Sequence, residues 1–344
     1  MSDLGVAVWG AGWVSGEHVK AWEAVPNCRV VAIGSRKEAS ARKVAAATGV
    51  DARIYADEVP ERAYERMLQD PDVNVVSICT PNHLHAREGI WAAQAGKHFC
   101  IEKPIAINLE ELRQLRDAVR QAQVKTVVSF VLRWNPLFET IKALLAQNAI
   151  GRIFYAEVDY WHGIGDWYSG WEWVTKKSSG ASAFLTGGCH AVDAIRWFVG
   201  SDITEVAAYS TRCGQDYEYD PNVVAAVKFA SGAIGKLSAS FECQMPYSFN
   251  IDLLGSHGTI RGNKLYSKTL LPGQTDFAEI PTVLPDSGDV SHHPFKGEMA
   301  HFAECIRRNC ESHCNVEDAY KTHEVCIAVD RSVATGQPVS LPLA

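Results

Sequence analysis

The chain has 344 residues, of which 47% are hydrophobic and 21% are charged, and its formal net charge at pH 7 is -7. This length suits two domains of ordinary size, and the acidic balance argues against a surface that binds nucleic acid. No apolar run approaches the roughly 20 residues that span a bilayer, so no membrane role is predicted. Residues 1–4 lead straight into an apolar run without a secretory signal, which favours a cytoplasmic protein.

The first predicted strand, residues 6–9, runs directly into a turn rich in glycine. Its apolar residues suit a strand buried on both faces of a parallel sheet. Gly10 permits a tight turn, and Gly12 lets a diphosphate approach the backbone at the start of the next helix. The third position of this dinucleotide-binding pattern holds Ser15 in place of glycine, and a small residue still allows close helix packing. The cofactor contacts predicted in this turn are Gly10, Gly12, Trp13 and Val14.

A helix at residues 14–24 and a strand at residues 29–34 follow this turn. In sites that prefer NAD, an acidic residue after this strand accepts hydrogen bonds from a ribose, whereas NADP sites offer cations to the 2′-phosphate. This chain has Ser35, Arg36 and Lys37 there. The pattern favours NADP over NAD, with Ser35 and Arg36 as contacts. The alternative is that the two cations form an exposed helix start and NAD is bound.

Strands and helices continue to alternate, which predicts crossover connections and a doubly wound parallel sheet. The expected helices are residues 37–48, 61–68, 84–95 and 109–122, and the expected strands are near residue 54 and at 73–79, 98–101 and 126–132. Polar residues follow two of these strands, at the carboxyl edge where such sheets bind ligands. The cofactor contacts predicted there are Thr80, Pro81, Asn82 and His85 after one strand, and Glu102 and Lys103 after the next.

The pattern changes near residue 125, so we expect a dinucleotide-binding domain at residues 1–125 and a second domain at residues 126–344. A helix at 136–147 is followed by strands at 152–161, 204–211, 223–229, 233–241, 249–254 and 258–261. Adjacent strands, two of them joined by the turn Ser231-Gly232, predict a mainly antiparallel sheet in an α+β domain. Helices are expected at 296–308 and 316–335, and little regular structure at 272–294.

The chain contains ten cysteines. Without a secretory signal, in a chain of this length, we expect free or buried thiols. Cys310, His313 and Cys314 lie close together in the sequence, but no second pair of metal ligands accompanies them. No metal site is therefore predicted.

Several of these residues occur together in the order and spacing of the Gfo/Idh/MocA oxidoreductases, and the resemblance covers nearly the whole chain. The matching motifs are the glycine turn with His18, Thr80-Pro81-Asn82 with His85, Glu102-Lys103-Pro104, and Gly188-Cys189-His190 with Asp193. The resemblance implies an α/β fold, with an N-terminal Rossmann domain and a second domain whose large open antiparallel sheet forms a homodimer or homotetramer. It also implies a cyclic sugar or polyol as substrate, and a Lys-Pro peptide that is commonly cis.

Oxidation of a secondary alcohol needs a base for the hydroxyl proton and a group that stabilises the developing alkoxide. Lys103, at the carboxyl end of a strand, is expected to supply positive charge or a hydrogen bond. His190 is expected to begin the helix that ends at Gly200, where the helix dipole favours a neutral ring. Asp193, three residues further on, could orient this ring or hold a substrate hydroxyl. The alternative is that His190 and Asp193 are capping groups.

The chain departs from the family pattern four residues before His190, where many members carry Asp and this chain has Thr186. The change leaves open whether a carboxylate assists there and which substrate hydroxyl is recognised. Aromatic and polar side chains near residues 161–173 suit a carbohydrate site, although a subunit interface would have a similar composition. The further substrate contacts predicted are Arg133, Trp161, Trp167 and Lys176, with Lys177 as a neighbour of the last.

The sequence therefore predicts an NAD(P)-dependent dehydrogenase that acts on a sugar or cyclitol, with Lys103 and His190 at the centre of the chemistry. The alternatives within the family are a reductase and an enzyme that uses the cofactor transiently in glycoside cleavage. A regulator that senses the cofactor without turnover is the alternative outside catalysis.

Overall fold

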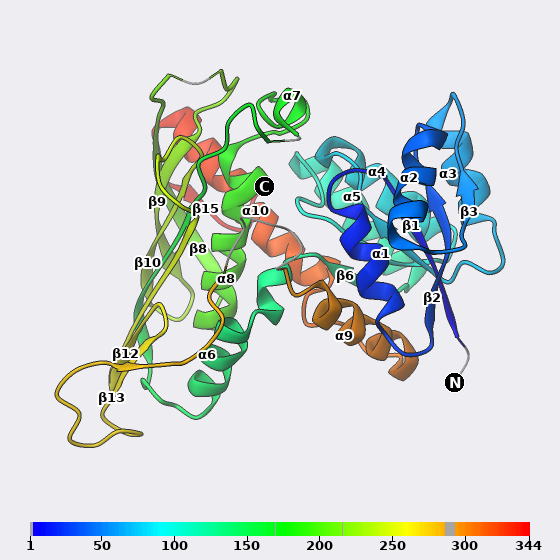
Figure 1. Ribbon diagram of the computed structural model, residues 1–344. Helices are drawn as coiled ribbons and strands as arrows, with labels where there is room; N and C mark the ends of the chain where they lie inside the picture. The colour runs from blue at the N-terminus through cyan, green and yellow to red at the C-terminus, as the bar shows by residue number, and fades with distance from the viewer. Residues whose placement is uncertain (1–2, 169, 215, 286–292) are drawn as a thin grey trace. The chain divides into compact units, whose positions relative to one another are not determined.

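The computed structural model describes residues 3–168, 170–214, 216–285 and 293–344. The chain forms two compact units (Figure 1). The first unit comprises Met1–Val131 and Pro294–Tyr320, and the second comprises Leu132–His293 and Lys321–Ala344. A segment near the C-terminus therefore returns to the first unit, which no motif in the sequence indicates.

The first unit is built on a six-stranded sheet in the order β3-β2-β1-β4-β5-β6. Every neighbouring pair is parallel, which confirms the predicted doubly wound sheet of Rossmann type. The order reverses between β1 and β4, and the carboxyl ends of strands at such a point are where these sheets bind ligands. The strands are β1 (Leu4–Trp9), β2 (Cys28–Gly34), β3 (Arg53–Tyr55), β4 (Val75–Ile78), β5 (His98–Ile101) and β6 (Thr126–Val128).

Helices pack on both faces of this sheet, as crossover connections require. The helices of the first unit are α1 (Ser15–Glu23), α2 (Glu38–Thr48), α3 (Pro60–Leu68), α4 (Asn82–Gln94), α5 (Leu109–Ala122) and α9 (Phe295–Arg308). Figure 1 shows α9 beside α1, and the rings of Trp22 and Phe302 lie 6.2 Å apart between them. Both side chains are fully buried, so α9 belongs to the core of this unit.

The strand expected at residues 126–132 is shorter than predicted. β6 ends at Val128, and the backbone N–H of Phe130 bonds back to the carbonyl of Val128 at 2.7 Å. The chain then forms the 3-10 turn η1 (Val131–Trp134), which carries Arg133. The apolar residues that suggested a longer strand are buried in this turn instead.

The second unit is built on a nine-stranded sheet in the order β14-β13-β12-β11-β7-β10-β9-β8-β15. Its described neighbours are antiparallel except for β7 and β10, so the predicted mainly antiparallel sheet is confirmed. The strands are β7 (Ile153–Trp161), β8 (Ile203–Thr211), β9 (Asn222–Phe229), β10 (Ile234–Ser240), β11 (Ser248–Gly255), β12 (Gly258–Arg261), β13 (Lys264–Ser267), β14 (Ala278–Glu279) and β15 (Val339–Ser340).

Helices cover one face of this sheet, and α8 lies along it (Figure 1). The helical segments are α6 (Pro136–Ala146), α7 (Trp171–Val174), the π-helical turn η2 (Phe184–Gly188), α8 (Cys189–Val199) and α10 (Val316–Thr335), whose first turn belongs to the first unit. Part of the segment 272–294 falls at residues 286–292, outside the described residues. Nowhere in the described chain is a helix both long and apolar enough to cross a membrane.

Side chains of successive strand residues point to opposite faces of the sheet. Ala156, Val158 and Tyr160 of β7 are buried on the face that α8 covers. The opposite face carries Tyr209 and Val224, which are cross-strand neighbours and are 76% and 42% exposed. This second face is the open face of the sheet, and it also carries the ion pairs of Lys236 with Glu157 and of Lys228 with Glu205.

Candidate active site

The predicted dinucleotide turn joins β1 to α1 in the first unit. Gly10 has a φ of +103°, and a Cβ there would lie 2.5 Å from the carbonyl oxygen of Cys79, so only glycine fits. A Cβ at Gly12 would meet no atom within 4 Å, which leaves open space over its backbone. Ser15 Oγ donates to the carbonyl of Gly12 at 2.7 Å and fixes the turn. The turn therefore fits a diphosphate at the start of α1.

Two further residues of this turn are predicted contacts. Trp13 is 45% exposed, and Val14 has helical dihedral angles just before α1. Both lie in the segment between the open backbone of Gly12 and the first turn of α1.

Ser35, half-buried, follows β2, and Arg36 and Lys37 after it are exposed. The first acidic residue is Glu38, which starts α2 and pairs with Arg42 at 2.6 Å. No carboxylate therefore stands directly after β2, where NAD-preferring sites carry one.

Glu102 and Lys103 follow β5. Glu102 Oε1 lies 3.0 Å from Nε2 of His18, whose Nδ1 lies 2.8 Å from Ser77 Oγ. Burial acts to raise the pKa of Glu102, but the hydrogen bond and charge of His18 and the charge of Lys103 outweigh it, so that the pKa is lowered. The Lys103–Pro104 peptide is cis, as the resemblance implies.

His85 connects the segment after β4 with the segment after β5. Its Nδ1 lies 2.7 Å from the carbonyl oxygen of Pro104, and its Nε2 lies 2.7 Å from that of Thr80. Burial lowers the pKa of His85, against the effect of these two carbonyl groups. Pro81 precedes α4 in an extended conformation, and Asn82 begins the helix and is buried. His85 therefore holds the backbone of the predicted site in place.

His190 is the second residue of α8 in the second unit, and the helix does not begin there. The π-helical turn η2 runs directly into α8, so helical backbone precedes His190 and the argument from a helix N-terminus does not apply to it. The residue is 8% exposed. Its ring stacks on that of Tyr160, with centroids 5.8 Å apart and planes inclined by 18°.

The sequence does not point to Tyr160 or Tyr247 as site residues. The hydroxyl of Tyr160 lies 3.3 Å from Nδ1 of His162, and the ring of Tyr247 meets both residues edge-on at 5.6 and 5.4 Å. Burial raises the pKa of Tyr160. Alternation along β7 could have placed Tyr160 on the face of His190. Tyr247 lies just before β11 and has no comparable signal.

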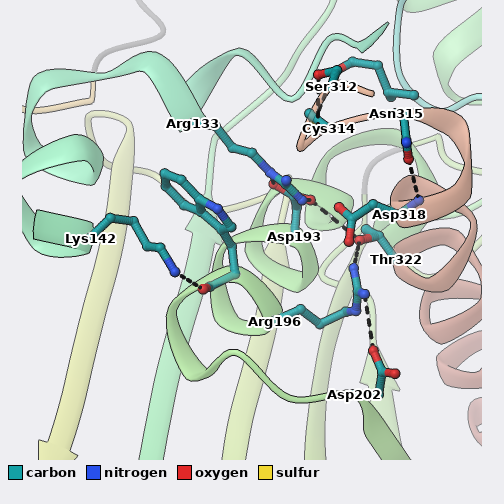
Figure 2. Close-up of polar contacts among 12 residues, drawn as sticks. Arg133, Lys142, Asp193, Arg196, Asp202, Ser312, Cys314, Asn315, Asp318 and Thr322 are labelled. Atoms are coloured by element: carbon teal, nitrogen blue, oxygen red, sulfur yellow. Dashed lines mark hydrogen bonds and ion pairs between the residues drawn. The ribbon is translucent and has the colours of Figure 1, made fainter. Parts of the chain in front are cut away.

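Arg133 and Asp193, both predicted to meet substrate, point toward each other in Figure 2. Arg133 Nε and Nη2 donate to the Asp193 carboxylate at 2.8 and 2.5 Å, and the two side chains are 2% and 4% exposed. Thr322 of α10 donates to the same carboxylate at 3.4 Å and accepts from Arg196 at 2.7 Å. The pair therefore fixes η1 and α10 to α8, one turn beyond His190.

Thr186 lies in η2 and is 8% exposed. Its hydroxyl donates to the carbonyl oxygen of Gly180 at 2.5 Å. The group that stands in place of the family aspartate is therefore engaged with the backbone.

The other predicted substrate contacts are dispersed. Trp167 is 64% exposed, and its ring lies 6.2 Å from that of His162. Trp161 points to the open face of the sheet, where Nε1 donates to Ser238 Oγ at 2.8 Å. Lys176 is exposed and pairs with Glu218 at 3.2 Å. Of these three, only Trp167 lies near the rings around His190, which are those of Tyr160, His162 and Tyr247.

Among the residues that the structure describes, no three His, Cys, Asp or Glu side chains gather in a way that could hold a metal ion. Cys314, one of the three residues weighed as metal ligands in the sequence, is buried, and its Sγ donates to the carbonyl oxygen of Val128 at 3.2 Å.

The two units thus carry different chemical groups. The first offers an open backbone for a diphosphate and a lysine beside an ionised carboxylate. The second offers an imidazole among aromatic rings, on a helix fixed by a buried ion pair. The groups of the first can bind an anion and stabilise negative charge, and those of the second can exchange a proton.

Both halves of the chain match known protein families. Residues 4–130 match an oxidoreductase family with an NAD-binding Rossmann fold, and residues 138–261 match the GFO/IDH/MocA C-terminal domain. The sequence is 28% identical over 342 residues to scyllo-inositol 2-dehydrogenase (NAD(+)) of Bacillus subtilis, covering 97% of this chain and 95% of that protein. It is 30% identical over 293 residues to levoglucosan dehydrogenase of Pseudarthrobacter phenanthrenivorans, covering 76% and 73%.

The fold is shared with solved structures over the whole chain. A levoglucosan dehydrogenase in complex with NADH superposes with a TM-score of 0.89 at 25% identity, and the match covers 100% of both chains. A complex of levoglucosan dehydrogenase with NADH and levoglucosan gives a TM-score of 0.88 at 24% identity, covering 99% and 100%.

Proposed function

This chain belongs to the GFO/IDH/MocA family of NAD-binding oxidoreductases, and from that premise we propose that it transfers a hydride between a nicotinamide dinucleotide and a cyclic sugar or polyol. The reacting group is a secondary alcohol in one direction and a ketone in the other. The observation that carries the proposal is the presence of both Lys103 and His190 on the two matched family domains.

The residues of the first unit bind the cofactor and stabilise charge. When bound, the nicotinamide dinucleotide supplies the hydride acceptor of alcohol oxidation. Gly12 and the start of α1 hold its diphosphate. Lys103 Nζ, a cation beside the ionised carboxylate of Glu102, stabilises the negative charge that develops on the substrate oxygen.

The residues of the second unit hold the substrate and move its proton. His190 accepts the hydroxyl proton in oxidation and returns it in reduction. Asp193 acts as a positioning residue, because its carboxylate is committed to Arg133 and fixes α8 one turn from His190. Thr186 offers no carboxylate, so this chain recognises a different pattern of substrate hydroxyls from relatives that carry Asp.

A cyclic, hydroxylated substrate suits the side chains around His190. Trp167 is 64% exposed and presents a ring face against which C–H groups stack, and His162 beside it offers a hydrogen-bonding group. The names of the two curated relatives, an inositol dehydrogenase and a levoglucosan dehydrogenase, support the same class.

The end of β2 favours NADP over NAD in our proposal. Arg36 and Lys37 are exposed and follow Ser35, so cations and a hydroxyl stand where NAD-preferring sites carry an acid. Arg36 then meets the 2′-phosphate through a charge-assisted hydrogen bond.

We also propose a homodimer or homotetramer formed through the open face of the nine-stranded sheet. Tyr209, Val224 and Ile234 project from this face with 76%, 42% and 54% of their surface exposed. Exposed apolar side chains on an open sheet suit a second copy of the chain. Sedimentation equilibrium should give an oligomer for the wild type and a smaller species for Val224→Asp, and a monomeric wild type contradicts the proposal.

The function is tested by the absorbance of reduced nicotinamide across a panel of cyclic sugars and polyols. Substrate-dependent formation of reduced cofactor is expected with at least one member. Turnover only with keto-sugars and reduced cofactor would identify a reductase, and glycoside cleavage without net reduction would identify transient use of the cofactor. Tight cofactor binding without any turnover would favour a sensor and contradict the proposal.

A further inference from the structure

Glu88 is a buried carboxyl group behind the dinucleotide turn. It lies on α4 and is 4% exposed. Its Oε1 accepts from Nε1 of Trp9, the last residue of β1, at 2.8 Å, and its Oε2 meets the hydroxyl of Thr80, just after β4. A Cβ at Gly10 would lie 3.0 Å from the backbone nitrogen of Thr80, so Thr80 adjoins the glycine turn.

The protonation state of Glu88 decides what the Thr80 hydroxyl offers to other groups. The indole N–H of Trp9 only donates, so Oε1 of Glu88 must accept. When Glu88 is ionised, Oε2 also accepts, the Thr80 proton is committed to it, and Thr80 presents only lone pairs. When Oε2 is protonated it donates to Thr80, whose own proton is then available to a third group.

Resting on the proposed function, we propose that Glu88 controls dinucleotide binding by fixing the direction in which Thr80 donates, and that the protonated form binds the dinucleotide more tightly. A diphosphate carries only acceptor oxygens, so the Thr80 hydroxyl can form a hydrogen bond with it only by donating its proton. An ionised Glu88 also places a buried negative charge beside the turn that receives the anion.

The surroundings of Glu88 bring its pKa into the neutral range. Burial raises its pKa to about 7, against the hydrogen bonds from Thr80 and Trp9 and the charge of Arg87. The charge of Glu61 on α3 raises it further. Among the described residues, Cys79 and Tyr64 are also titratable neighbours of Glu88, and the Tyr64 hydroxyl donates to its backbone carbonyl at 3.0 Å. His85 lies one turn before Glu88 on α4, with Nε2 2.7 Å from the carbonyl oxygen of Thr80.

The proposal is tested with NAD+ as the probe, because it carries no group that titrates near neutral pH. Titration calorimetry of the full chain from about pH 6 to about pH 8.5 should show affinity falling by about tenfold, the size of one unit of pKa change on binding. In buffers of different ionisation enthalpy, binding near pH 7.5 should take up a fraction of a proton. If Glu88 had only a structural role, we would expect neither the pH dependence of the affinity nor the proton uptake.

Glu88→Gln is the diagnostic variant. Its amide oxygen faces Trp9 and its amide nitrogen donates to Thr80, which reproduces the protonated state. It should bind NAD+ as tightly as the wild type does at low pH, without proton uptake or pH dependence. The matched control, Glu65→Gln on the exposed side of α3, should keep the wild-type profile.

A double-mutant cycle tests whether Glu88 acts through the hydroxyl. In a Thr80→Val background, Glu88→Gln should change the Kd for NAD+ by less than about threefold. A full tenfold effect there, or retained pH dependence in Glu88→Gln alone, overturns the proposal. Failure of the folded wild type to bind any dinucleotide would overturn the proposed function together with it.

Discussion

In the first unit the buried carboxyl groups of Glu88 and Glu298 meet neutral donors, whereas in the second unit that of Asp193 meets the guanidinium of Arg133. Glu298 accepts a hydrogen bond from Ser129 Oγ at 3.0 Å. Burial and the charge of a neighbouring carboxylate raise its pKa to about 8. The acid in the second unit is held in a bidentate ion pair instead.

The contrast matches what each unit is proposed to bind. Acids that hold their protons add little negative charge to a unit that receives an anionic dinucleotide. Two other acids of that unit are paired with basic groups: Glu102 with His18, and the buried Asp70 with Arg53. In the second unit, the ion pair of Arg133 and Asp193 holds α8, the helix that carries His190. Its proposed role is to fix the position of this helix.

The largest effect is expected from removing the reacting group of either unit. Lys103→Ala and His190→Ala should each lower kcat by about 10²- to 10⁴-fold, because charge stabilisation and proton transfer are lost. The Kd for the dinucleotide should stay within about threefold of wild type. Lys43→Ala and His257→Ala, at exposed positions, serve as matched controls. Full activity in either test variant would remove that residue from the mechanism.

The ion pair of the second unit is probed next. Arg133→Ala should lower the free energy of unfolding by about 3–5 kcal/mol, since Asp193 is left buried without its partner. Arg212→Ala breaks a half-exposed pair with Asp220 and should cost at most about 1 kcal/mol. Urea unfolding measures both values. Equal costs would show that burial does not separate the two pairs.

Glu298 gives the corresponding test in the first unit. Its pKa is about 8 in the folded chain and about 4.3 in the unfolded chain, so between these values only the unfolded state has lost the proton. The stability of the wild type therefore falls as pH rises through this window, and Glu298→Gln removes that fall.

The variant should gain about 1–3 kcal/mol over the wild type between about pH 5 and about pH 8 in urea unfolding. Glu304→Gln, on the same helix and 45% exposed, should show no such gain. A stability difference that does not change with pH would mean that Glu298 is ionised in the folded chain.

The smallest effect is expected at the end of β2. Arg36→Ala should lower the ratio of kcat/KM for NADPH to that for NADH by about tenfold, through loss of one charge-assisted hydrogen bond. Arg42→Ala, an exposed position within α2, is the control. An unchanged ratio would remove Arg36 from cofactor choice.

The sequence predicts the first unit well because its features are local. The glycine turn, the residues after β4 and the Glu102-Lys103-Pro104 segment are short motifs at strand ends, and alternation gives the sheet. The strand predicted beyond Val128 is too long, because apolar residues in a buried turn resemble a strand. No local motif indicates that residues 294–320 belong to the first unit.

The environment of His190 is harder to predict because it depends on distant parts of the chain. Tyr160 and Tyr247 lie far apart in the sequence, and only the pairing of β7 with β11 brings them together. Arg133 and Asp193 have opposite charges, but 60 residues separate them, and nothing in either segment indicates a mutual pair. The sequence groups Trp161 with the aromatic residues that follow it. Because side chains alternate along β7, it points to the open face of the sheet instead.

Hydride transfer itself is tested most directly with a deuterium label on the carbinol carbon of the sugar or polyol that gives the highest turnover. The account predicts that the reduced nicotinamide recovered from the reaction carries the deuterium, as shown by a mass gain of one unit in the cofactor. Reduced cofactor without the label, or no reduced cofactor with any member of the panel, would contradict it.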